Sequence, residues 1–204
     1  KFIPKHDLAR LAIRVERDVL QETVGWQDQI FAAYGGLNLV EFERDGNFTV
    51  HRVALPKARQ LELEQSILLF FTGLTRRASD VEKNKIRNLA AIRENLLRMR
   101  RMVDKAHSVL TGGTPLSEFG RLLDATWQEK RLLDPCVSNP DIDRMYNLGT
   151  GAGALGGKLL GAGGGGFMAF FVPLEQRNAV RAALQGYYEI PFSINAPGSS
   201  IVHS

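Results

Sequence analysis

The amino-acid sequence, 204 residues long, predicts an α+β fold whose larger part is a ferredoxin-like layer of antiparallel strands with helices on one face. Short apolar segments at 66–72, 167–172 and 190–195 have the length and composition of strands. Residues 79–110 and 114–127 place apolar side chains three and four positions apart, which is the spacing of amphipathic helices. Antiparallel strands with helices on one face are typical of an α+β domain.

The N-terminal part predicts two helices followed by a β-hairpin. Residues 6–23 and 27–34 have helical spacing of their apolar side chains. Residues 37–42 and 48–53 are strand-like, and Asp45-Gly46-Asn47 between them is typical of a tight turn.

A domain boundary is predicted at residues 56–60, which are interpreted as a connection between domain 1–55 and domain 56–204. The second domain opens with the strand 66–72, and a Ser79-Asp-Val-Glu82 capping box starts its long helix. The remaining elements, in order, are a helix from Thr114-Pro115, a helix from Asn139-Pro140 toward Leu160, the strand 167–172, a helix over 174–185 and the strand 190–195.

The composition, 44% hydrophobic and 24% charged, is typical of a globular protein. No apolar run approaches the ~20 residues of a membrane helix, so we expect a cytoplasmic protein that does not contact a membrane. The single cysteine, Cys136, fits a reducing compartment. The four histidines are too scattered to indicate a metal site.

Positive charge is concentrated between Arg76 and Lys105, where ten basic residues accompany four acidic ones. The simplest interpretation is a solvated helix face, although a basic helix also attracts nucleic acid. The segment has no aromatic residue that could stack on bases, so nucleic acid is the least favoured partner.

The most informative stretch covers residues 158–171, KLLGAGGGGFMAFF. Five of the six residues from Gly161 to Gly166 are glycine, directly before an apolar strand. Each ordered glycine costs backbone entropy, so a cluster of them needs a compensating role. A main chain without Cβ atoms can turn its N–H groups inward to bind an anion, or pack beneath such a site. The alternative is a tight crossover from a helix to a strand.

Four segments carry a family resemblance. Residues 158–171 are similar to the third motif of the GHMP kinases, small-molecule kinases related to galactokinase, homoserine kinase and mevalonate kinase. Residues 25–36, GWQDQIFAAYGG, resemble the helix that carries the catalytic aspartate in the sugar-kinase branch of that family. Residues 70–73 and 138–146 resemble the heptose 7-phosphate kinase subgroup. The resemblance extends over nearly the whole chain, in the family's order.

This resemblance implies an ATP-dependent sugar kinase that phosphorylates the anomeric hydroxyl of a heptose 7-phosphate. Residues 1–55 would be the end of the GHMP N-terminal catalytic domain, and 56–204 the C-terminal domain. The family's second motif, a Gly/Ser-rich phosphate loop, is absent from these residues. We therefore expect the C-terminal part of a longer kinase, with that loop and the Mg²⁺ ligands in the missing part or on a separate chain. A fucokinase-type enzyme and a non-catalytic sugar-binding relative are the alternatives.

Asp28 is the predicted catalytic base. It lies in the first turn of a predicted helix, where the positive end of the helix dipole favours negative charge. Phosphoryl transfer requires a group that accepts the proton of the attacking hydroxyl, and the resemblance implies this role for Asp28. Trp26 is either a core aromatic or a platform for a sugar face. Gln27 and Gln29 could hydrogen-bond to sugar hydroxyls.

Further substrate-binding residues are predicted where the strand 66–72 ends, at Thr72, Gly73, Arg76 and Arg77. A substrate that carries its own phosphate needs a cationic clamp, and the planar arginine fork fits one, although exposed loop arginines are the simpler interpretation. The predicted ATP-binding residues, which would form the wall behind the phosphates, are Gly161, Gly163, Gly164, Gly165 and Gly166. Lys158 is either a phosphate contact or a lysine at a helix C-terminus.

Changing Arg76 and Arg77 together to alanine in the complete enzyme is expected to weaken binding of the phosphorylated sugar by about 1.5–3 kcal/mol per lost charged hydrogen bond. ATP affinity should stay nearly constant, because the clamp serves only the sugar phosphate. Titration calorimetry with the phosphorylated and the plain sugar measures both, and an equal loss for the two sugars would reject the clamp.

Overall fold

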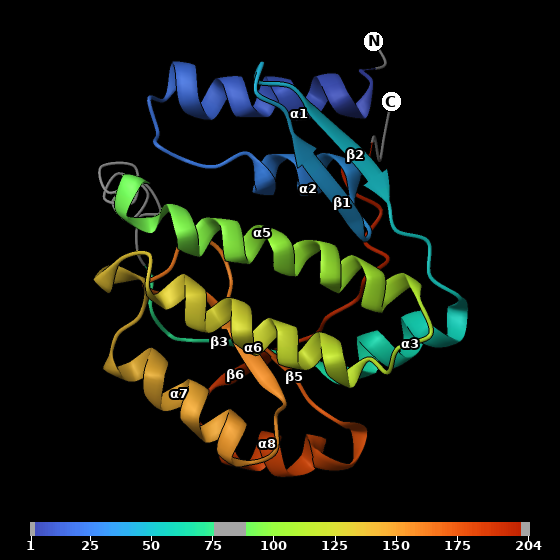
Figure 1. Ribbon diagram of the computed structural model, residues 1–204, viewed down its shortest axis with the longest axis vertical. Coiled ribbons are helices and arrows are strands. Elements are labelled where there is room, and N and C mark those ends of the chain that lie inside the picture. The colour runs from blue at the N-terminus through green and yellow to red at the C-terminus, as the bar shows by residue number, and fades with distance from the viewer. Residues whose placement is uncertain (1–2, 76–88, 201–204) are drawn as a thin grey trace. The chain divides into compact units, whose positions relative to one another are not determined.

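The computed structural model describes residues 3–75 and 89–200, and its main chain separates into two compact units (Figure 1). The first unit contains residues 1–54 and 193–204, and the second contains residues 55–192. The assignment of residues 1–55 and 56–204 to two kinase domains stays a prediction.

The first unit contains two helices and a two-stranded hairpin. Helix α1 (Lys5–Arg14) continues into a π-helical turn, η1 (Val15–Val19), and is followed by α2 (Gln27–Tyr34). Strands β1 (Asn38–Phe42) and β2 (Phe48–Arg52) pair antiparallel around the predicted turn. A small core of Ala9, Ile30, Ala33 and Phe48 holds α1, α2 and the hairpin together. The helix over 27–34 and the hairpin are therefore confirmed.

The C-terminal segment returns to the first unit and explains how α2 ends. The N–H of Gly36 donates to the carbonyl of Ala196 (2.9 Å), and the N–H of Ser199 donates to that of Ala32 (2.8 Å). Gly35 has a φ of 66°, and a Cβ there would lie 2.2 Å from the main-chain nitrogen of Gly198. Only glycine fits between the end of α2 and this segment.

The second unit is a four-stranded antiparallel sheet with helices packed against it. Its strands lie in the order β4-β5-β3-β6, which is the order of the ferredoxin-like fold. The elements are α3 (Lys57–Ser66), β3 (Ile67–Phe71), α5 (Leu89–Thr111), α6 (Ser117–Arg131), η2 (Pro135–Val137), α7 (Pro140–Gly151), β4 (Gly156–Leu159), β5 (Phe167–Phe171), η3 (Leu174–Gln176), α8 (Arg177–Ala183) and β6 (Tyr188–Ile190). The predicted α+β class and ferredoxin-like layer are confirmed.

Three predicted boundaries were wrong. Residues 57–66 form helix α3 instead of a connection, with Pro56 as its N-cap. The helix that begins at Pro140 ends at Gly151, and residues 156–159 form the edge strand β4. The final strand ends at Ile190 and not near residue 195. Gly156 lets β4 lie directly against α6, because a Cβ there would lie 2.4 Å from the carbonyl oxygen of Gly120. The predicted capping box at 79–82 lies outside the described residues.

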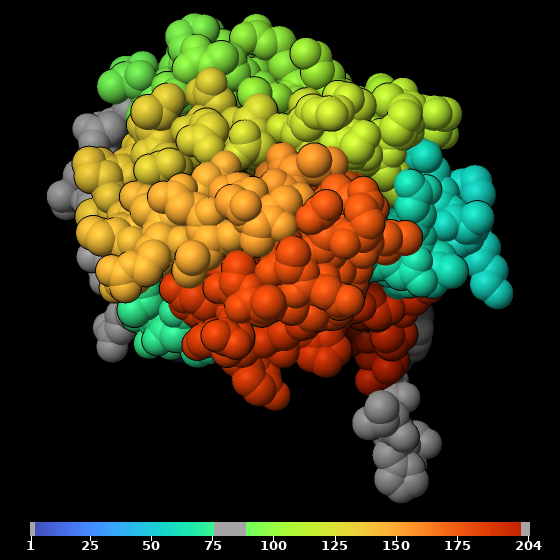
Figure 2. Space-filling view, turned by 90° about the horizontal axis from the view of Figure 1, so that it is seen from below, coloured from blue at the N-terminus to red at the C-terminus, as the bar shows by residue number. Residues whose placement is uncertain are grey.

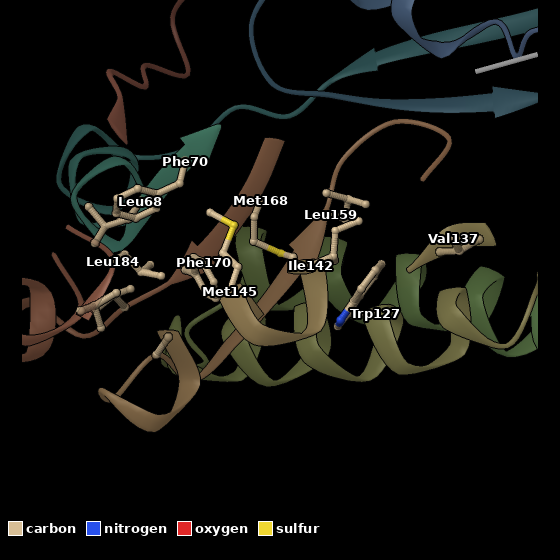
Figure 3. Close-up of a cluster of buried hydrophobic side chains, with 13 residues drawn as sticks. Leu68, Phe70, Trp127, Val137, Ile142, Met145, Leu159, Met168, Phe170 and Leu184 are labelled. Atoms are coloured by element: carbon tan, nitrogen blue, oxygen red, sulfur yellow. The ribbon is translucent and has the colours of Figure 1, made fainter. Parts of the chain in front are cut away.

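The core of the second unit fills the space between the sheet and its helices (Figure 3). Leu68 and Phe70 of β3 lie opposite Phe170 and Met168 of β5, so the four side chains project from one face of the sheet. Helices α7 and α8 cover this face and form a continuous surface in Figure 2. The fully buried side chains from the surrounding elements are Trp127, Ile142, Met145, Leu159, Val180 and Leu184. Burial of these large apolar side chains is the main force that stabilises the unit.

Gly149→Ala is expected to lower the free energy of unfolding by about 1–3 kcal/mol, because the added methyl overpacks the core. A Cβ at Gly149 would lie 2.4 Å from the ring of Phe170, which is fully buried and has no room to move. Gly151→Ala on the same helix is the control, since nothing lies within 4 Å of a Cβ there. Denaturant unfolding of both variants tests the prediction, and equal stabilities would contradict it.

Candidate functional site

The glycine-rich stretch forms the loop that joins the antiparallel strands β4 and β5. We call residues 161–166 the glycine loop. Four of its residues have a positive φ: Gly161 (67°), Gly163 (120°), Gly164 (78°) and Gly166 (99°). The expected route from a helix into a strand was wrong, because a strand precedes the loop. Lys158 accordingly lies in β4 and not at a helix C-terminus.

Three segments that are distant in the sequence hold the glycine loop. From α6, the Lys130 ammonium donates to the carbonyl oxygens of Leu159 (2.8 Å) and Gly161 (2.6 Å). From η2, the carbonyl of Val137 accepts the N–H of Gly164 (2.9 Å). Beyond β3, Thr72 donates its N–H and its hydroxyl to the carbonyl of Gly166 (2.9 Å each), and Leu74 accepts the N–H of Gly166 (2.9 Å). The loop is thus anchored at its start, middle and end.

These anchors leave alternate N–H groups of the loop without a partner. Within the described residues, no hydrogen bond engages the N–H of Gly161, Gly163 or Gly165. Main-chain N–H groups in a loop of mixed φ sign form anion-binding concavities. The loop therefore offers neutral hydrogen-bond donors of the kind that bind phosphate.

Two of the loop glycines are required because neighbouring main chain lies against them. A Cβ on Gly163 would be 2.8 Å from the Cα of Val137, and one on Gly165 would be 2.6 Å from the carbonyl oxygen of Leu74. Gly165 does not have a positive φ, so at this position the space, and not the backbone conformation, excludes other residues. Close approach of these segments fixes the path of the loop.

The predicted residues at the end of β3 lie beside the glycine loop. Thr72 is buried, and its hydroxyl is occupied by the carbonyl of Gly166. Gly73 is exposed and has a φ of 76°. The structure therefore brings two of the predicted substrate-binding residues next to the predicted ATP-binding loop. Arg76 and Arg77 lie outside the described residues.

Lys158 is the cation of β4, one strand position before Leu159. It lies opposite Ala169 of β5 and is partly buried. Burial lowers the pKa of its ammonium below the ordinary value of lysine. No hydrogen bond or ion pair joins this ammonium to another described residue, so it is available to an anionic ligand.

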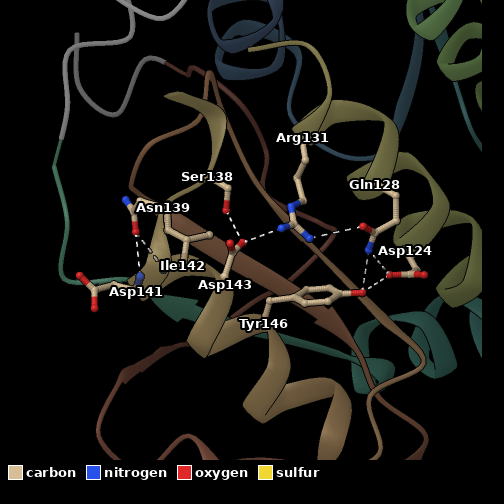
Figure 4. A network of polar contacts seen from close by, with 9 residues as sticks. All are labelled: Asp124, Gln128, Arg131, Ser138, Asn139, Asp141, Ile142, Asp143 and Tyr146. Atoms are coloured by element: carbon tan, nitrogen blue, oxygen red, sulfur yellow. Dashed lines mark hydrogen bonds and ion pairs between the residues drawn. The ribbon is translucent and has the colours of Figure 1, made fainter. Parts of the chain in front are cut away.

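A polar network fixes η2 and α7, and with them the support beneath the loop (Figure 4). Asp143 forms an ion pair with Arg131 of α6 (3.2 Å) and accepts the hydroxyl of Ser138 (2.6 Å). Asn139 caps α7 by accepting main-chain N–H groups of its first turn. Tyr146 donates to Asp124, and burial together with this hydrogen bond raises the pKa of Tyr146 above its ordinary value. Contacts between α6 and α7 therefore keep Val137 in place beneath Gly164.

Asp28 lies in the first unit, as the second residue of α2. Its side chain is exposed, as is that of Gln27. Gln29 points inward with 6% exposure, and its amide donates to the carboxylate of Glu16 (2.6 Å). One helix turn therefore presents Asp28 and Gln27 to solvent and Gln29 to the interior.

Trp26 packs within the first unit. Its ring meets Phe42 edge-on at a centroid distance of 6.0 Å, and the guanidinium of Arg17 lies 5.6 Å above it. The same ring borders a cavity of about 540 Å³ that is lined by α1, η1 and the hairpin. This arrangement favours the packing interpretation of Trp26 and leaves one edge of the ring accessible.

Sequence reasoning missed Glu16, whose carboxylate accepts a hydrogen bond from Gln29 in the first turn of α2. The π-helical turn that carries it is closed by the N–H of Leu20, which donates to the carbonyl of Val15 five residues earlier. Gln21 then adopts a φ of 57°, the one positive φ of a non-glycine residue within the described chain. π-helical turns are frequent at functional sites. No periodicity in the sequence distinguishes such a turn from an α-helix.

A magnesium site is not formed by the described residues alone. Within residues 3–75 and 89–200, His, Cys, Asp and Glu side chains form no group of three or more that could hold a metal. In the same residues, the helices are too short or too polar to cross a membrane.

Comparison with known proteins finds a family model that matches part of the chain. Residues 110–190 match the family described as GHMP kinases C terminal. These residues form a GHMP kinase C-terminal domain. They include α6, α7, the glycine loop and β5, so the matched region contains all of the loop and two of its three anchors.

Relatives extend the similarity over nearly the whole chain. D-glycero-alpha-D-manno-heptose 7-phosphate kinase of Campylobacter jejuni is 32% identical over 95% of this chain, which spans 58% of that protein. The bifunctional fucokinase/GDP-fucose pyrophosphorylase of Arabidopsis thaliana is 30% identical over 92% of the chain and 18% of its own length. A solved structure of a D-glycero-D-manno-heptose 1-phosphate kinase from Bacteroides thetaiotaomicron has a TM-score of 0.66 and 27% identity, over 94% of this chain and 53% of that one.

Gly165→Ala is expected to destabilise the glycine loop by about 1–3 kcal/mol, because its Cβ would overlap the main chain of Leu74. Gly161→Ala is the control variant, because a Cβ there meets no atom within 4 Å. Only its φ of 67° opposes the substitution, which should lower the stability of the loop by about 1–2 kcal/mol. Hydrogen exchange of the loop and of the Leu74 segment distinguishes them. We expect the Gly166–Leu74 hydrogen bond to lose protection in the Gly165 variant alone, and similar loss in both would contradict the space argument.

Proposed function

We propose that this chain is the C-terminal part of an ATP-dependent sugar kinase that phosphorylates the anomeric hydroxyl of a heptose 7-phosphate. The observation that carries the proposal is the glycine loop: the N–H groups of Gly161, Gly163 and Gly165 have no partner among the described residues, while three anchors hold other groups of the loop. The GHMP kinase C-terminal domain supports a kinase, and the heptose phosphate kinases among the relatives support a sugar substrate.

Asp28 is the proposed base for this reaction. Its exposed position in the first turn of α2 lets a substrate hydroxyl approach, and the helix N-terminus stabilises the negative charge of the carboxylate. In phosphoryl transfer such a group orients the hydroxyl and accepts its proton. Gln27 beside it is exposed and remains a candidate for hydrogen bonds to the sugar, as does Gln29 through a rearrangement of its contact with Glu16.

ATP is the proposed phosphate donor. The groups that would bind its phosphates are the N–H groups of Gly161, Gly163 and Gly165 and the ammonium of Lys158, which have no partner among the described residues. Mg²⁺, when bound to ATP, would neutralise part of the phosphate charge. The chain's own residues bind and orient the phosphates and hold the acceptor hydroxyl.

The relatives name different sugars, which leaves a second candidate. One is named a heptose 7-phosphate kinase, another structure a heptose 1-phosphate kinase, and the plant relative a fucokinase. A heptose phosphate kinase and a fucokinase differ in whether the sugar substrate already carries a phosphate. Assaying the full-length enzyme with ATP and either heptose 7-phosphate or fucose separates them, and no transfer to any sugar would favour the non-catalytic alternative.

Asp28→Asn in the full-length enzyme is expected to lower kcat by about 10²–10⁴-fold, the usual contribution of a positioned base. Substrate affinity and melting temperature should change little, because the Asp28 side chain is exposed and asparagine has the same shape as aspartate. A kcat of the Asn variant close to that of the wild type would remove Asp28 from the mechanism.

A further inference from the structure

Lys130 is buried at the end of α6, with 6% of its surface exposed. Lysine is rarely buried to this extent unless its ammonium is well bonded. Here the ammonium reaches the main chain of the glycine loop at the carbonyl oxygens of Leu159 (2.8 Å) and Gly161 (2.6 Å). Neither contact is predicted by the GHMP resemblance of the sequence.

The contact with Gly161 fixes the orientation of a peptide at the start of the loop. In a trans peptide, the carbonyl of one residue and the N–H of the next point in opposite directions. Holding the oxygens of Leu159 and Gly161 against α6 therefore directs the N–H groups of Leu160 and Ala162 away from it. The first of these completes the β4–β5 ladder through Phe167 (2.8 Å). Lys130 thus sets the direction in which the loop leaves the strand.

The same contact makes the loop suitable for an anion. A phosphate that approaches the loop is repelled by exposed carbonyl oxygens and attracted by N–H groups. Lys130 turns two carbonyls toward its own charge, while the N–H groups of Gly161, Gly163 and Gly165 stay without a partner among the described residues. Its positive charge also acts on the loop through a buried, low-dielectric environment, where electrostatic interactions are strong.

We propose that Lys130 is a positioning residue for phosphate binding: by holding the carbonyls of Leu159 and Gly161 toward α6, it orders the glycine loop, whose N–H groups at Gly161, Gly163 and Gly165 have no partner among the described residues, for a nucleotide polyphosphate. The choice of nucleotide as ligand rests on the proposed kinase function, whereas the ordering of the loop by Lys130 does not. Lys130 is not a phosphate ligand, because its ammonium is buried and occupied by the two carbonyls.

The test uses the full-length protein with Lys130→Met, which keeps the length of the side chain and removes the charged donor. We expect hydrogen exchange at residues 161–166 of the ligand-free protein to accelerate by roughly tenfold or more, as expected for loss of hydrogen bonds to a charged group. The Kd for ATP should rise by about tenfold for the same reason, and the Kd for adenosine, which lacks phosphates, should stay within about twofold.

Two controls separate positioning from general destabilisation. Gly149→Ala weakens the core without touching the loop, so it should lower the melting temperature and leave both the loop exchange and the ATP Kd unchanged. Lys105→Met removes an exposed lysine of α5 and should change none of these quantities. If Gly149→Ala raised the ATP Kd as much as Lys130→Met, the proposal would be rejected.

Each remaining outcome also decides the question. Loop exchange and ATP affinity close to the wild type in Lys130→Met would make Lys130 a space-filling residue and overturn the proposal. A wild-type protein that binds no ATP would reject the nucleotide, while the exchange data would still decide the role of Lys130. If Lys130→Met does not fold, Lys130→Gln is used instead, because it keeps amide donors without the charge. Smaller increases in loop exchange and in the ATP Kd would then support the proposal, and the absence of any increase would overturn it.

Discussion

The close approach of helix α6 to the edge strand β4 is the constraint on which the rest of the second unit depends. A Cβ on Gly156 would lie 2.4 Å from the carbonyl oxygen of Gly120, so the helix and strand touch main chain to main chain. From this contact, the ten residue steps from Gly120 to Lys130 rise about 15 Å along the helix, and the five residue steps from Gly156 to Gly161 rise about 16 Å along the strand. Lys130 therefore arrives beside the carbonyl of Gly161 at the point where β4 becomes the glycine loop.

The glycine loop is ordered by its surroundings and not by its own sequence. A run of glycine has the largest conformational freedom of any segment, so the loop needs external hydrogen bonds to keep one path. Lys130, Val137 and Thr72 supply them from three separate elements. The Arg131–Asp143 ion pair and the cap of α7 hold two of those elements together, which connects a surface network to the loop.

The loop glycines serve two different physical purposes. Gly161 and Gly166 have open space around a Cβ, so their positive φ is the reason for glycine. Gly165 has an ordinary φ and is glycine because Leu74 lies against it, and Gly163 meets both conditions through Val137. The loop is therefore shaped partly by its own backbone conformation and partly by the segments that pack against it.

Most local elements, and the kind of chemistry to expect, could be inferred from the amino-acid sequence. Periodicity found α2, the hairpin and β5, because the apolar spacing of a segment reflects the face that it buries. The family motifs pointed to the glycine loop and to Asp28. The strand at residues 156–159 could not be predicted in this way. Four residues, two of them glycine, are too few to show a periodic pattern, and they become β4 by pairing with β5. The hydrogen bonds from Thr72 and Lys130 to the loop could not be predicted either. Their acceptors are main-chain carbonyls, which every residue has, so they depend on the path of the chain and not on the identity of the accepting residue.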